Sequence, residues 1–331
     1  MWGALFPGQG SQHVGMGRFL FEEFAIAKQT FEEASDALSL NFKKLCFEGP
    51  ESDLALTENT QPALLLVSTT TFRVIELEFG IKIGAAAGHS IGEYAAVVTA
   101  GAVGFQEALR AVRVRGQAMQ RAVPVGQGGM VAVLNLTDDQ VLKLCAFAEE
   151  GSGAKPLEPA NFNAPGQIVI SGSQKAIDFL MANAKSDDLM KRFAPETPRM
   201  RLIPLTVSAP FHCSLMKPAE EEMRLVLNET KFNDAKWPIV QNVTALEVTA
   251  GATLRENLIK QVSGAVRWTQ CMARLKELGV TQTIEFGAGK VLSGLSKKID
   301  SATPGPLNIN ALEDLKVLEA HLEAQVSGVQ S

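Results

Sequence analysis

The 331-residue sequence has no run of about 18 apolar residues, so we expect no transmembrane helix. Its first residues, MWGALFPGQG, lack the basic and apolar regions of a signal peptide. It also lacks a basic excess: 31 Lys and Arg stand against 36 Asp and Glu, a net charge of −5, whereas nucleic-acid binders carry a basic surface. We therefore expect a cytoplasmic protein that binds neither membrane nor nucleic acid.

Cysteine is scarce as well. The four cysteines, Cys46, Cys145, Cys213 and Cys271, form no CxxC or zinc spacing, which predicts reduced thiols and no metal site. Cys213 follows His212, but its surroundings do not resemble a nucleophile turn, so we expect it to be a small buried hydrophobe.

Small residues are concentrated in IKIGAAAGHSIGEYAAVVTA, residues 81–100. An apolar run leads into Gly88-His89-Ser90-Ile91-Gly92, and a helical pattern opens at Glu93. In this strand–turn–helix arrangement, flanking glycines let the backbone pass close to its neighbours, while the serine hydroxyl stands clear of the sheet. The following helix N-terminus favours developing negative charge. Ser90 is therefore predicted to be a nucleophile.

The residues before this turn predict a parallel α/β arrangement. A strand over 2–6 enters a glycine-rich loop, followed by helices from about 16, over 25–38 and over 61–79, with Pro62 in a first turn. The loop order Gly8, Gly10, His13 breaks the dinucleotide fingerprint at its third glycine, so the sequence does not support a dinucleotide site.

An amphipathic helix is predicted over 105–123 and carries four arginines. At about 100° per residue, Arg115 lies roughly 60° from the centre of the apolar stripe, and the other three lie further away. Arg115 is thus the arginine expected to point inward. It could bind a carboxylate through its two-pronged guanidinium or form a structural salt bridge, and its helical position leaves both open.

Residues 128–207 read as strand, helix, two strands, helix, strand, with Thr137 or Asp138 capping the first helix. This βαββαβ order predicts a ferredoxin-like subdomain inserted into a larger α/β domain made of 1–127 and 208–331. Beyond it we expect a strand over 238–245, one or two helices over 253–279, and a strand, glycine-rich turn and helix over 281–299. A cleft is expected between the two parts.

A serine nucleophile needs a base, and the chain holds four histidines. His89 adjoins Ser90, so its side chain diverges, and His321 lies opposite the apolar face of a terminal helix. His13 stays open. His212 lies where the chain leaves the predicted subdomain and is the favoured base.

Seven blocks, in order along nearly the whole chain, resemble malonyl-CoA:acyl carrier protein transacylases, a family that serves bacterial fatty acid synthesis. These blocks are FPGQGSQ (6–12), TQPAL (60–64), GHSIGEY (88–94), RVRGQAMQ (113–120), NFNAPGQIVISG (161–172), PFHCSLMKPA (210–219) and FGAGKVLSGL (286–295).

The resemblance implies a hydrolase-like core and ping-pong transfer of malonyl from CoA to acyl carrier protein through a malonyl-Ser90 ester, by a monomer without a cofactor. It implies that His212 is the base, oriented by a backbone carbonyl, and that Arg115 binds the malonyl carboxylate. The remaining implied positions are the oxyanion-hole amides, Gln9 and Ile91, and the glutamine near the base, Gln261.

Two positions depart from the family pattern. After Gln261 the family commonly reads YNPVRW or YNPVQW, whereas this chain reads VSGAVRW. Phe211 replaces a common serine and resembles malonyl-selective polyketide acyltransferases, in which bulk here disfavours an α-methyl group. Malonyl selectivity over methylmalonyl is therefore the hypothesis.

Two other functions compete with acyl transfer. An α/β-hydrolase esterase would use His321 with an acid such as Asp300, although the chain lacks an HGGG-type loop. A non-catalytic module that docks carrier protein would need no serine nucleophile. For carrier-protein docking, the candidate basic residues are Lys191, Arg192, Arg199, Arg201, Lys297 and Lys298.

Overall fold

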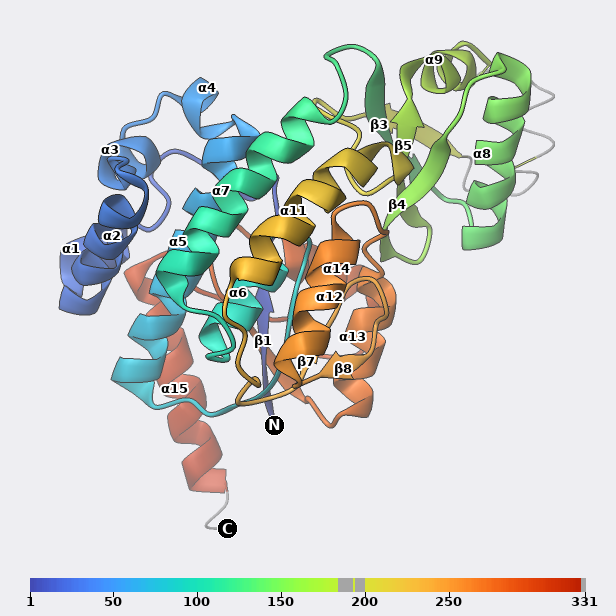
Figure 1. Ribbon diagram of the computed structural model, residues 1–331. Coiled ribbons are helices and arrows are strands. Elements are labelled where there is room, and N and C mark those ends of the chain that lie inside the picture. The colour runs from blue at the N-terminus through green and yellow to red at the C-terminus, as the bar shows by residue number, and fades with distance from the viewer. Residues whose placement is uncertain (184–192, 194–199, 329–331) are drawn as a thin grey trace.

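The structure is a computed structural model that describes residues 1–183, 193 and 200–328 (Figure 1). Its larger sheet has six strands in the order β10-β9-β1-β2-β7-β8, parallel except for the antiparallel β7–β8 pair. The strands are β1 (Trp2–Phe6), β2 (Ile83–Gly88), β7 (Ile239–Val240), β8 (Glu247–Val248), β9 (Gln282–Glu285) and β10 (Leu307–Asn308).

Both faces of this sheet are buried. Along β1, Ala4 and Phe6 pack into the main core, whereas Leu5 packs into a second apolar cluster on the other face with Trp268. Two buried faces explain why these strands read as continuous apolar runs rather than as alternating patterns. The α/β core expected from the sequence is thus confirmed.

Helices cover this sheet (Figure 1). They are α1 (Arg18–Glu23), α2 (Ala25–Leu38), α3 (Phe42–Phe47), α4 (Glu51–Leu54), α5 (Thr57–Phe79), α6 (Gly92–Thr99), α7 (Phe105–Arg121), the 3₁₀ turn η1 (Ser214–Met216), α11 (Lys217–Glu229), α12 (Gly251–Gln261), α13 (Trp268–Glu277), α14 (Val291–Ile299) and α15 (Leu312–Gly328). Within the described ranges, no helix combines the length and apolarity needed to cross a bilayer.

A second sheet lies beside the first, at the upper right of Figure 1. Its elements follow the predicted βαββαβ succession, and its antiparallel strand order is β4-β5-β3-β6. They are β3 (Gly128–Leu134), α8 (Asp138–Ser152), β4 (Leu157–Ala164), β5 (Gln167–Ser173), α9 (Gln174–Asn183) and β6 (Arg201–Pro204).

Successive side chains of β3 point to opposite faces, and so β3 contributes to the apolar cores of both sheets. Val131 and Val133 pack with α8 and α9, while Met130 belongs to the core of the larger sheet. A parallel bridge between Asn161 and Val266 adds a backbone connection. We propose that the domain boundaries fall at 127/128 and 207/208, as the sequence suggested.

Two predicted elements differ from the structure. Helix α5 begins at Thr57, so Pro62 lies inside the helix and not in its first turn. Pro62 has no N–H for the carbonyl of Glu58, and Nη1 of Arg113 lies 3.1 Å from that oxygen instead. The strand expected over 238–245 is limited to Ile239–Val240, because the chain then turns toward the serine.

Candidate active site

The turn around Ser90 is built by close backbone contacts. Ser90 has φ +52°, in the left-handed region, between β2 and α6. A Cβ on Gly88 would lie 2.0 Å from the carbonyl carbon of Gly92, and one on Gly92 would lie 2.1 Å from the oxygen of Phe6. Both flanking glycines are therefore required sterically, which confirms the turn predicted from the pentapeptide.

His212 lies against Ser90. The serine Oγ is 2.7 Å from Nε2 of His212, and Nδ1 lies 2.9 Å from the backbone oxygen of Gln261 and 3.1 Å from that of Gly264. Because carbonyl oxygens only accept, Nδ1 carries the proton and Nε2 is free to accept the proton of Ser90. This is the arrangement of a serine nucleophile with its base.

Electrostatics keep this base neutral. Burial, helped by the positive charge of Arg115, lowers the pKa of His212 to about 3. The imidazole is therefore unprotonated near neutral pH and can accept a proton.

Arg115 is buried as predicted, with a relative exposure of 1%. Nη1 donates to Oε1 of Gln61 at 2.9 Å, Nη2 donates to Oε1 of Gln261 at 2.9 Å, and Nη2 lies 3.4 Å from Oγ of Ser90. Among the described residues no carboxylate forms an ion pair with this guanidinium. A buried charge normally has an anionic partner, so an anion beside Ser90 would complete the site.

The loop after β1 closes one side of the site. A Cβ on Gly8 would lie 2.6 Å from the backbone oxygen of His89, so this loop packs directly on the serine turn. Within the described part of the chain, the backbone N–H groups of Gln9 and Ile91 donate to no backbone or side-chain acceptor. Two such free amides next to a nucleophile suit a developing oxyanion.

The side chain of Asn242 stabilises the serine turn through two hydrogen bonds to its backbone. Its Oδ1 accepts from the backbone N–H of Ser90 at 2.8 Å, and its Nδ2 donates to the oxygen of Gly88 at 2.7 Å. Glu93, which is fully buried, accepts from the backbone N–H of Asn242 at 2.7 Å. Sequence reasoning missed Asn242, Glu93 and Gln61. For Asn242 the available signal was its place just after a strand, since the carboxyl ends of parallel strands share one edge.

A cleft of about 360 Å³ opens over these groups. Its lining combines loops and helices around the larger sheet with strands of the second sheet, and it includes Gln9, Arg115, Met130, Asn161 and Phe211. The cleft expected between the two parts is therefore present, with Ser90 and His212 on its wall.

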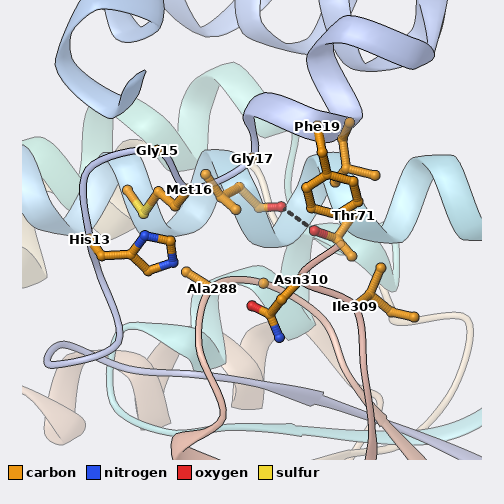
Figure 2. Close-up of a pocket in the computed structure, with 12 residues that line it drawn as sticks. His13, Gly15, Met16, Gly17, Phe19, Thr71, Ala288, Ile309 and Asn310 are labelled. Atoms are coloured by element: carbon orange, nitrogen blue, oxygen red, sulfur yellow. Dashed lines mark hydrogen bonds between the residues drawn. The ribbon is translucent and has the colours of Figure 1, made fainter. Parts of the chain in front are cut away.

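The other three histidines form no hydrogen bond with the hydroxyl of Ser90, although His89 also lines the cleft. His13 lines a separate small pocket with Met16 and Asn310 (Figure 2). His89 points toward Asn163, whose Oδ1 lies 2.8 Å from its Nε2. His321 packs on Trp2 with 5.6 Å between the ring centroids, so it is half-buried, whereas its place opposite the apolar face of the helix predicts an exposed side chain.

Trp2 begins β1, whereas Ser90 follows the end of the parallel strand β2. His321 and Ser90 therefore lie at opposite ends of the sheet, and the structure does not bring the esterase pair together. Asp300, its suggested acid, instead pairs with Nζ of Lys276 at 2.8 Å.

The cysteines are free and buried, and burial raises the pKa of the Cys213 thiol to about 11. Over the ranges that the structure describes, no group of three or more His, Cys, Asp or Glu side chains could hold a metal ion. Of the six basic docking candidates, Lys191, Arg192 and Arg199 lie outside the described residues, and the others are exposed.

Comparisons with known proteins identify the fold. The acyl transferase domain model matches residues 4–295. The malonyl CoA-acyl carrier protein transacylase of Bacillus subtilis strain 168 is 45% identical over 300 residues, covering 89% of each chain. The transacylase structure from Clostridium perfringens superposes with a TM-score of 0.91 at 36% identity, covering 100% of this chain and 99% of that one.

A third relative was solved with a partner. It is a malonyl-transacylase in complex with a type II PKS acyl-carrier protein, with a TM-score of 0.87 and 38% identity, covering 95% of this chain and 97% of that one.

Proposed function

The chain belongs to the acyl transferase family, and from that membership we propose that it transfers malonyl from malonyl-CoA to the phosphopantetheine thiol of acyl carrier protein. One observation supports the choice of acyl group above all others. Arg115 is a buried cation, 3.4 Å from the nucleophile, and among the described residues no carboxylate forms an ion pair with it. A malonyl group supplies the missing carboxylate, whereas an acetyl group does not.

In the first half-reaction, Oγ of Ser90 attacks the thioester carbonyl and Nε2 of His212 accepts the hydroxyl proton. The backbone N–H groups of Gln9 and Ile91 stabilise the oxyanion of the tetrahedral intermediate. His212 then protonates the departing CoA thiolate, which leaves a malonyl-Ser90 ester and free CoA.

In the second half-reaction, the carrier-protein thiol attacks the ester. Nε2 of His212 takes the thiol proton and returns it to Oγ of Ser90 as the ester bond breaks. Throughout, the carbonyl oxygens of Gln261 and Gly264 accept from Nδ1–H and stabilise the transient imidazolium.

No step in this scheme uses a metal or an organic cofactor, so we propose that none is needed. We further propose that the enzyme is a cytoplasmic monomer, and gel filtration of the purified chain tests its oligomeric state.

Incubation with malonyl-CoA followed by peptide mass spectrometry tests the proposal. We expect a mass increase of one malonyl group on the peptide that contains Ser90, and its loss when holo acyl carrier protein is added. Ser90→Ala and His212→Ala should remain unmodified, whereas His321→Ala should behave as wild type. Modification that depends on His321 would favour an esterase, and no modification of the wild type would favour a docking module.

A further inference from the structure

The last residue of α12 and the loop that follows it form a segment that contacts His212. This segment supplies the carbonyl oxygens of Gln261 and Gly264 that accept from Nδ1, and both must keep their direction for the imidazole to keep its tautomer. This loop is also where the sequence departs from the family pattern, reading Val262-Ser263-Gly264-Ala265. Contacts specific to this chain must therefore fix the orientation of the loop backbone.

Ser263 makes one side-chain contact that can do so. Its Oγ donates to Oε2 of Glu220, whose side chain is only 4% exposed. The same carboxylate accepts from Nζ of Lys217 at 2.7 Å and from Nη2 of Arg224 at 3.4 Å. A carboxylate held by two cations is a fixed and strong acceptor for the serine hydroxyl.

Glu220 lies in the first turn of α11, which follows η1 directly after His212. The contact therefore joins the segment that carries the imidazole to the segment that supplies its acceptors. A closed path results: from His212 along the chain to Glu220, across to Ser263, and through Gly264 back to Nδ1.

From this closed path we infer that Ser263 and Glu220 are positioning residues for His212, which they act on through the backbone carbonyls of Gln261 and Gly264. The inference rests on the proposed function only for the identity of the natural substrate. The test of the inference does not depend on that function, because activation of Ser90 by His212 can be measured without any acyl donor.

The test measures the rate at which a fluorophosphonate probe modifies Ser90 in the full-length protein. The reaction forms an Oγ–P bond and releases fluoride while His212 takes the serine proton. Malonyl transfer is measured in parallel on the same variants. We expect Ser263→Ala to slow both the labelling rate and kcat about tenfold, less than the ~100-fold associated with a 1 Å misplacement, with KM for malonyl-CoA unchanged.

Ser263→Thr keeps the hydroxyl and should restore both rates. Ser296→Ala is the matched control, since that half-buried serine donates to the backbone oxygen of Leu292 on α14, away from the site. Glu220→Ala should slow labelling as Ser263→Ala does, and the double variant should be no slower than either single variant.

Labelling at the wild-type rate in Ser263→Ala, failure of Ser263→Thr to restore it, or effects that multiply in the double variant would each overturn the inference. Wild-type labelling without malonyl transfer would instead count against the proposed function and leave the positioning result standing.

Discussion

Gln261 contacts Arg115 and His212 at once: its Oε1 accepts from Nη2 of Arg115 at 2.9 Å, and its backbone oxygen accepts from Nδ1 of His212 at 2.9 Å. Its Nε2 also donates to the backbone oxygen of Ser90 at 2.9 Å. Arg115, His212 and Ser90 thus each contact Gln261, so removing this residue itself would disturb the surroundings of all three.

Arg115→Ala should remove selectivity for an acyl group that carries a carboxylate. We expect kcat/KM for malonyl-CoA to fall roughly 100-fold or more, because a charge-assisted two-bond contact is lost, while kcat/KM for acetyl-CoA does not fall. Steady-state rates with both esters measure this. Arg110→Ala, at an exposed position of the same helix, is the control. An equal loss with both esters would contradict the assignment.

Acylation of Ser90 should persist at mildly acidic pH. An ordinary histidine loses its base function below about 6.5, but burial lowers the pKa of His212 to about 3, so it stays neutral as the pH falls through that range. The same shift means that, between these two pH values, the unfolded chain binds a proton at His212 that the folded chain does not bind. The contribution of His212 to the free energy of unfolding is therefore fully present above about pH 6.5 and is lost progressively as the pH falls toward about 3.

Single-turnover acylation over pH checks the first expectation, and urea unfolding over the same pH values checks the second. A kinetic pKa near 6.5 for acylation would show that His212 is more solvated than its 4% exposure suggests.

Phe211→Ser should widen acyl selectivity. Phe211 lines the cleft beside His212 and is 8% exposed, so its ring occupies space next to the reacting serine. We expect the ratio of kcat/KM for methylmalonyl-CoA to that for malonyl-CoA to rise about tenfold, in line with the small discrimination that one methyl group permits. Competition between the two esters measures the ratio directly. Comparable use of both esters by the wild type would remove the basis of the hypothesis.

Gly88→Ala should prevent folding of the active turn. The added Cβ would meet backbone atoms of Gly92 at 2.0 Å, and backbone cannot give way as a flexible side chain does. We expect little soluble protein or a Tm far below that of the wild type. Gly294→Ala in α14 is the opposite case, since nothing lies within 4 Å, and it should stabilise by about 0.5–1 kcal/mol. Thermal melting of both variants compares them.

The sequence predicted Ser90, the inward direction of Arg115 and the βαββαβ order because each depends on local pattern. A glycine–serine–glycine turn, a helical period and a strand–helix succession are visible in short stretches. The start of α5 was placed four residues late, because Pro62 normally marks a first turn and the compensating donor, Arg113, comes from another helix.

Asn242, Gln61 and Glu220 could not be found in this way. Each acts through a contact with a residue more than 40 positions away, so the neighbouring sequence does not reveal what its side chain contacts. The half-buried position of His321 depends likewise on Trp2, at the other end of the chain. Such contacts follow from tertiary packing, which overrides what a single helix face suggests.

The second sheet interrupts the chain between Ser90 and His212, and β6 ends at Pro204 before the segment that carries the base. This order limits how such enzymes can be recombined. A chimaera that exchanges the second sheet at residue 204 keeps the recipient's base and the residue before it, whereas an exchange extended past 211 brings the donor's Phe211 position into the recipient's site. The residue before His212 and the inserted sheet can therefore be exchanged separately by the choice of junction.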